Sequence, residues 1–203
     1  MAIFDVPLAR LRERGSIKWR RFAADVLPLF VAEMDADLAA PIAERLQRAI
    51  ALGDTGYPEV PEYQAAMADF AGWLWGWDLD PAHAKLATDV MTGMRDAVVA
   101  ASEPGDATVF TPPIYPPFRA ISAGRRAVEV PLVDDRLDLA GLEAAFAAER
   151  PSVYLLCSPH NPNGTIHTLE ELTAVADLAA RYGVTVIADE IHAPLAGAAH
   201  TPY

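Results

Sequence analysis

Three segments of the sequence carry side chains that suit a planar, charged ligand. Asn161 lies in "SPHNPNG" after the apolar run "VYLLC", and Asp189 and His192 lie in "DEIH" after the run "VTVIA". Tyr115 lies between two pairs of prolines in "PPIYPP". An amide donates to a phenolate-like oxygen, an aromatic face stacks on a planar ring, and a carboxylate pairs with a protonated ring nitrogen. Together these residues predict a site for a flat heteroaromatic group.

A fourth segment, "TGMRDAV", suits an anion. It follows an apolar run at 85–91, and we expect a helix to open on Gly93. A helix that opens on glycine presents free N–H groups and a positive dipole end to a phosphate. Arg95 would add a positive charge there.

Each of these features also has a purely structural reading. Tyr115 is equally well explained as a packed aromatic in a turn, and His192 as a polar loop residue. The "HNPNG" segment is typical of a turn with proline punctuation. Asp189 suits the cap of a following element. The arrangement of all of them after strands is what favours a site.

The elements that would position these residues form an α/β pattern. Apolar runs predict strands, and apolar residues at helical spacing predict helices. The strands are expected at 85–91, 107–113, 126–133, 152–158 and 184–190, and the helices at 41–50, 61–76, 92–102, 139–149 and from Thr168 to Gly183. Strand, helix and strand in succession predict a parallel sheet, whose ligands bind beyond the carboxyl ends of the strands.

Composition narrows the class of protein. The net charge of −12 argues against nucleic acid or an anionic membrane surface as a partner. The single cysteine, Cys157, excludes an internal disulfide and fits a reducing compartment, so we expect a cytoplasmic protein. No motif indicates a metal site. Residues 1–40 are expected to form an N-terminal arm, and residues 41–203 a larger domain.

The paired motifs "SPHNPNG" and "VTVIADEIH" resemble those of pyridoxal-phosphate enzymes of the aspartate-aminotransferase fold, fold type I. With "FVAEMDADLAAPI", "GYPEVPEY" and "PPIYPPF", the sequence is similar to the cystathionine β-lyase-like carbon–sulfur lyase branch. The resemblance implies the large domain of that fold, a mostly parallel sheet flanked by helices, with an N-terminal arm and without the C-terminal small domain. It also implies pyridoxal 5′-phosphate as cofactor, a small amino-acid substrate and a homodimer in the full-length parent.

The resemblance assigns roles around the cofactor ring. Asn161 would donate to the phenolic oxygen, Asp189 would pair with the pyridine nitrogen, and Tyr115 would stack on the ring. His192 occupies the place where many aminotransferases carry a tyrosine.

It also assigns roles at the phosphate. Gly93, Met94 and Arg95 would lie at the start of the phosphate-binding helix. Tyr57 would reach the phosphate of the neighbouring subunit's cofactor.

The sequence departs from the family pattern in one chemical respect. The family needs a lysine beyond the aspartate to bind the cofactor covalently, and the only lysines are Lys18 and Lys85. We therefore expect a cofactor-binding domain truncated before that lysine, from a carbon–sulfur β-lyase, with the chain alone inactive. The alternatives are a class I/II aminotransferase, or an inactive remnant or binding module of the same fold. A nicotinamide enzyme is disfavoured because no G-x-G-x-x-G motif follows a predicted strand.

Overall fold

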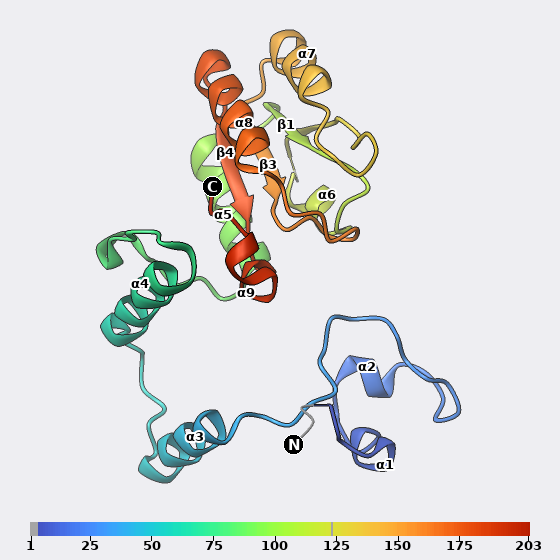
Figure 1. Cartoon of the computed structure of the whole chain (residues 1–203), viewed down its shortest axis with the longest axis vertical. Helices are drawn as coiled ribbons and strands as arrows, with labels where there is room; N and C mark the ends of the chain where they lie inside the picture. The colour runs from blue at the N-terminus through green and yellow to red at the C-terminus, as the bar shows by residue number, and fades with distance from the viewer. Residues whose placement is uncertain (1–3, 123) are drawn as a thin grey trace. The chain divides into compact units, whose positions relative to one another are not determined.

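The computed structural model describes residues 4–122 and 124–203 (Figure 1). The chain divides into two compact units, Met1–Glu59 and Val60–Tyr203, and each is described by itself. The expected arm at 1–40 and domain at 41–203 remain a prediction. The two compact units are defined by contacts within the chain and do not identify an arm or a cofactor-binding domain.

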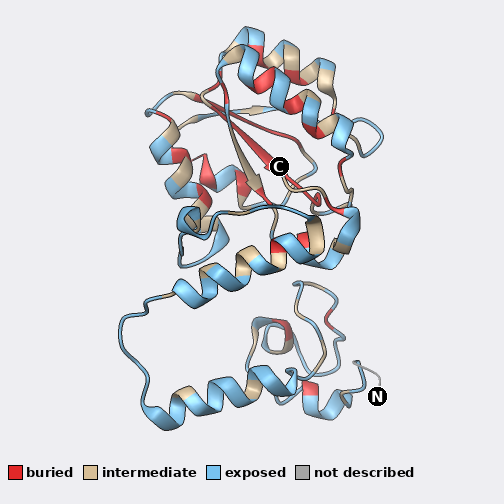
Figure 2. Cartoon of the chain, turned by 60° about the vertical axis from the view of Figure 1, so that its left-hand side comes forward, coloured by how far each residue is buried: buried red, intermediate tan, exposed pale blue. Residues whose placement is uncertain are grey.

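The first unit contains α1 (Leu8–Leu11), α2 (Ile17–Arg20) and α3 (Ala40–Leu52). The helix predicted at 41–50 is confirmed as α3, with proline in its first turn and Gly53 in the left-handed conformation after its last residue. Lys18 is buried, and its ammonium donates to the Asp35 carboxylate at 2.8 Å and to the Glu33 carbonyl at 2.7 Å. No residue of α3 is buried (Figure 2).

The second unit is built on a parallel sheet, as the strand–helix–strand pattern predicts. Within the described residues the sheet has four strands in the order β2-β1-β3-β4, and every pair is parallel. The strands are β1 (Ala107–Phe110), β2 (Arg126–Glu129), β3 (Val153–Cys157) and β4 (Thr185–Asp189). The helices are α4 (Pro61–Trp75), α5 (Val90–Ala101), α6 (Phe118–Ile121), α7 (Leu139–Glu149), α8 (Leu169–Tyr182) and α9 (Ala193–Ala196), with short 3₁₀ turns η1 (Pro81–His83) and η2 (Gly197–Ala199).

The strand predicted at 85–91 is wrong. Residues 84–87 have no regular structure, and α5 already begins at Val90. The Asp89 side chain accepts from the Thr92 N–H at 2.8 Å, which caps the helix and ends the extended segment. The hydrogen bond that caps α5 therefore decides the local structure, and the apolar run does not form a strand.

Helices cover both faces of the sheet, because successive side chains of a strand point to opposite faces. Tyr154 and Leu156 of β3 pack in a core with residues of α7 and α8 (Figure 1). Leu155 and Cys157 pack in a second core with residues of α5 and α6. β3 is buried along its whole length, as its continuous apolar run predicts (Figure 2).

The apolar run at 184–188 favours a buried strand for β4 as well, but the structure differs from that expectation. β4 pairs only with β3 in the described sheet, its first residue Thr185 is exposed, and only Asp189 is buried. The sheet thus ends at β4 in the described residues, and the carboxylate is the most protected part of the strand.

α8 begins with a capping box formed by Thr168 and Glu171. The Thr168 hydroxyl accepts from the Glu171 N–H at 3.2 Å, and the Glu171 carboxylate accepts from the Thr168 N–H at 2.7 Å. Leu172, Val175 and Ala179 follow helical spacing and are buried, whereas Ala176 is exposed. Across the described residues, 4–122 and 124–203, no helix has the length and apolar character needed to cross a membrane.

Candidate cofactor site

The carboxyl ends of β3 and β4 bring three of the predicted site residues together. Cys157 at the end of β3 is paired in register with Asp189 at the end of β4. Beyond these ends, the Asn161 amide nitrogen lies 3.5 Å from Nε2 of His192. Parallel strands end at one edge of a sheet, so Asn161, Asp189 and His192 gather there.

Asp189 is a buried carboxylate with little compensation. It is 5% exposed, and its Oδ1 accepts from the Ile191 N–H at 3.1 Å. Burial raises the pKa of Asp189 above its usual range, against the Ile191 hydrogen bond and the nearby His192. A cation placed against this carboxylate would restore its charge, because an opposite charge favours the ionised form.

The loop that carries Asn161 is held by the strand before it. The Asn161 N–H lies 3.4 Å from the Cys157 sulfur, and the Cys157 thiol lies 3.5 Å from the Pro159 carbonyl. Burial raises the pKa of the Cys157 thiol to about 12, so the thiol keeps its proton for that second contact. The cysteine therefore serves as an uncharged brace for the loop.

The loop that carries Tyr115 is tied to the Asn161 loop. Nε2 of His160, the residue before Asn161, lies 2.8 Å from the carbonyl oxygen of Pro113, two residues before Tyr115. Tyr115 is 39% exposed, so its ring is not locked in the core. The sequence alone gives His160 no role, because its partner Pro113 is distant in the chain.

The predicted phosphate segment requires a correction. The helix does not open on Gly93, since α5 starts three residues earlier at Val90. The Gly93 N–H already donates to the Asp89 carbonyl at 3.0 Å, and the Asp89 carboxylate occupies the first turn. A Cβ added to Gly93 would approach the Ala87 side chain to 3.1 Å, so this glycine permits close packing of the preceding loop.

The remaining predicted residues have separate environments. Met94 is buried in the core that contains Phe118 and Cys157, whereas Arg95 is exposed. Tyr57 is fully exposed and belongs to the first unit. Their proposed contacts with a phosphate therefore stay predictions.

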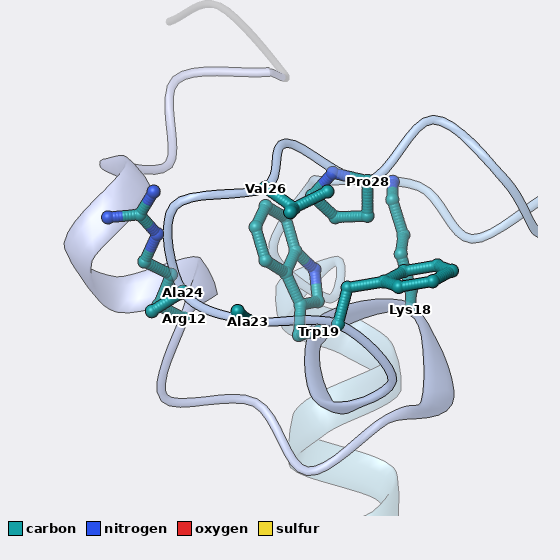
Figure 3. A pocket seen from close by; sticks show the side chains of 8 residues that line it. Arg12, Lys18, Trp19, Ala23, Ala24, Val26 and Pro28 are labelled. Atoms are coloured by element: carbon teal, nitrogen blue, oxygen red, sulfur yellow. The ribbon is translucent and has the colours of Figure 1, made fainter.

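The first unit contains a small cavity that includes none of the predicted site residues (Figure 3). Its volume is about 20 Å³, which is room for roughly one water molecule. Its lining includes Lys18 and Trp19. The Trp19 indole N–H is buried and has no hydrogen-bond partner among residues 4–122 and 124–203. The cavity is far too small for an aromatic cofactor.

The donor set at the ends of β3 and β4 fits the ring of pyridoxal phosphate. A buried carboxylate with a raised pKa suits a protonated ring nitrogen, and an amide with a free N–H suits a phenolic oxygen. Within residues 4–122 and 124–203, no group of three or more His, Cys, Asp or Glu side chains is arranged to hold a metal ion.

Comparison with known proteins gives a consistent result. The family model described as aminotransferase class I and II matches residues 25–202. A Mycobacterium leprae protein provisionally named cystathionine β-lyase is 48% identical over 98% of the chain and 53% of its own length. The cystathionine β-lyase of Corynebacterium glutamicum is 36% identical over 93% of the chain and 51% of its own length.

A solved structure shares the fold. A Corynebacterium diphtheriae protein, described provisionally as a PLP-dependent β-cystathionase, superposes with a TM-score of 0.88 at 30% identity. The match covers 93% of this chain and 50% of that one. The chain thus spans about half the length of the relatives it matches, and the predicted α/β fold is confirmed.

Proposed function

The chain belongs to the class I and II aminotransferase family, and we propose that it forms the cofactor-binding part of a pyridoxal-phosphate-dependent carbon–sulfur β-lyase. The substrate would be a cystathionine-type amino acid, and the products pyruvate, ammonia and a thiol. The observation that carries the cofactor proposal is the buried Asp189 carboxylate beside the Asn161 and His192 side chains. The lyase names of relatives that are 48% and 36% identical support the reaction.

When bound, pyridoxal phosphate supplies an electron sink that stabilises negative charge on the substrate's α-carbon. The task of Asp189 is to hold a proton at the ring nitrogen. Its carboxylate lies where water is largely excluded, so its attraction for that proton is stronger than in bulk solvent.

Asn161 has the right chemistry for the opposite side of the ring. An amide nitrogen only donates, so Nε2 of His192 accepts one of its two hydrogens at 3.5 Å. The second hydrogen remains for the phenolic oxygen. His192 thereby orients the amide, and Tyr115 supplies a flat face from the neighbouring loop.

The rest of the proposal concerns the longer parent protein. A lysine for covalent attachment and the group that binds the substrate carboxylate would come from sequence beyond this chain. We also propose a cytoplasmic homodimer in which Tyr57 reaches the partner subunit's cofactor. The full exposure of the Tyr57 side chain supports such a contact.

A class I or II aminotransferase is a second candidate, because the matching family model carries that description. The same proposed cofactor-binding residues, Asp189, Asn161 and Tyr115, would serve both reactions. The lyase breaks the bond between the substrate's β-carbon and sulfur and releases a thiol, whereas the aminotransferase leaves that bond intact and transfers the amino group to a 2-oxo acid.

The test is to express the reading frame that contains this chain, with any coding sequence that continues past Tyr203. The product is then incubated with pyridoxal phosphate and L-cystathionine. Pyruvate formation that needs no added 2-oxo acid supports the lyase, whereas amino transfer to a 2-oxo acid supports the aminotransferase. If the reading frame supplies a lysine for covalent attachment and the product shows neither activity, both the lyase and the aminotransferase proposals are overturned.

A further inference from the structure

We propose that His160 is a positioning residue: its Nε2–H joins the loop of Asn161 to the loop of Tyr115, and so sets the ring-binding groups relative to each other. This inference rests on the proposed function, because it concerns how the same site is assembled. His160 is a buried imidazole that is not itself one of the proposed ligand-binding residues, and this proposal gives it a role.

The Tyr115 loop has few ways to be anchored. The segment "PPIYPP" contains four prolines among its six residues, and proline has no N–H to donate. The four prolines therefore offer only carbonyl oxygens for backbone hydrogen bonds. The Leu132 N–H donates to the Pro112 carbonyl at 2.8 Å, and His160 reaches the Pro113 carbonyl at 2.8 Å.

The backbone of His160 is itself fixed. Its N–H donates to the Thr165 carbonyl at 2.8 Å, and its carbonyl accepts from the Gly164 N–H at 2.7 Å. These two bonds close the turn that contains Asn161. Because this turn is fixed, the hydrogen bond from the His160 side chain to Pro113 holds the Tyr115 loop in a defined position relative to the Asn161 loop.

The partner of the ring determines the direction of the hydrogen bond. A proline carbonyl only accepts, so Nε2 carries the hydrogen and donates it. Among the residues that the structure describes, Nδ1 has no hydrogen-bond partner, and the whole residue is 1% exposed. The imidazole is thus held by its hydrogen bond to Pro113 and by an edge-to-face contact with the His167 ring, whose centroid lies 5.9 Å away.

Two substitutions at position 160 distinguish the effect of the hydrogen bond from the effect of the ring's volume. His160→Gln keeps an N–H donor near the place of Nε2, whereas His160→Leu fills similar volume without a donor. The probe is 4′-deoxypyridoxine 5′-phosphate, which lacks the aldehyde and so reports ring recognition without coupling to lysine. Its dissociation constant for the full 203-residue chain is measured by equilibrium dialysis.

We expect His160→Leu to weaken binding about fivefold, the usual worth of one hydrogen bond, and His160→Gln to bind as the wild type does. In a Tyr115→Ala background the effect of His160→Leu should disappear, because the positioned ring is gone. Thr168→Ala is the control. It removes the hydroxyl that accepts from the Glu171 N–H at 3.2 Å at the start of α8. This control should lower the melting temperature and leave binding unchanged.

Wild-type affinity in His160→Leu would overturn the positioning role, as would an equal loss in the Tyr115→Ala background or in His160→Gln. Failure of the proposed function looks different. In that case the wild-type chain does not bind the analogue, or Asp189→Asn binds it equally well. The inference would then fall together with the proposed site.

Discussion

At the scale of single residues, Asp189 is placed where a carboxylate is costly by itself. It ends an apolar strand, it is 5% exposed, and burial raises its pKa. Such residues cluster at functional sites, because a ligand supplies what the fold leaves unpaired. The sequence predicted this carboxylate from its place after "VTVIA", but the degree of burial came only from the packing around β4.

Asp189→Asn is expected to stabilise the chain in the absence of cofactor. A raised pKa means that the folded state binds the proton more tightly than the unfolded state. That stabilisation is complete below the unfolded pKa and is lost as the pH rises through the folded pKa. The amide has no charge to bury, so at neutral pH the variant should gain about 1 kcal/mol in the free energy of unfolding.

Urea unfolding of both proteins at a series of pH values checks this. The wild type should lose stability relative to Asp189→Asn as the pH rises through that window, and the same variant should bind the ring analogue poorly. A variant that is less stable than the wild type at neutral pH would show that Asp189 is a structural group.

At the scale of elements, the apolar run of β3 and the patterns of α7 and α8 were predicted well, and the apolar run at 85–91 was not. β3, α7 and α8 lie where they were predicted, and each contributes buried side chains to the core. The run at 85–91 failed because Asp89 accepts from the Thr92 N–H and starts α5 early. The sequence "DVMT" contains that cap, and weighing it would have moved the helix start.

The first turn of α8 offers a test of the elements that support the site. Thr168→Ala removes the hydroxyl that accepts from the Glu171 N–H, and should lower the free energy of unfolding by about 1 kcal/mol. Thr168→Ser keeps the hydroxyl and should stay close to the wild type. Chemical denaturation of the three proteins gives the comparison, and equal stability of all three would contradict the capping role.

Glu171 adds a pH dependence to the same turn. Burial alone would raise the pKa of Glu171, but hydrogen bonds from Thr168 and Arg136 outweigh it and hold the pKa below its usual range. The resulting stabilisation is present above the unfolded pKa and is lost as the pH falls through the folded pKa. Glu171→Gln should therefore flatten the acid limb of the stability profile, and an unchanged acid limb would contradict this account.

At the scale of the whole molecule, the chain carries the proposed ring-binding groups, and neither of its two lysines is placed for covalent attachment of the proposed cofactor. Lys18 belongs to the first unit, where its ammonium is buried against Asp35. Lys85 lies near η1, with its ammonium 3.3 Å from the Ala82 carbonyl. The sequence predicted this half-site from the family resemblance, whereas the His160 bridge between loops depended on three-dimensional contacts.

The 203-residue chain alone is therefore expected to have no lyase turnover. Incubation with pyridoxal phosphate and L-cystathionine should give pyruvate only at the rate of free cofactor, measured by coupling to lactate dehydrogenase. Asp189→Ala serves as the control, and the two proteins should be indistinguishable in this assay. Turnover by the wild type well above Asp189→Ala would mean that one of the two lysines, or no lysine, suffices.

The most direct test of the central claim is the protonation state of the bound ring nitrogen. Pyridoxal phosphate labelled with ¹⁵N in the ring is added to the chain, and the ¹⁵N resonance is followed by NMR as the pH is raised. If Asp189 holds the proton, the bound ring should keep a pyridinium-type resonance at pH values where the free cofactor has lost it, and Asp189→Asn should abolish this. A bound ring that titrates as the free cofactor does, or that behaves alike in wild type and Asp189→Asn, would contradict the assignment of this site.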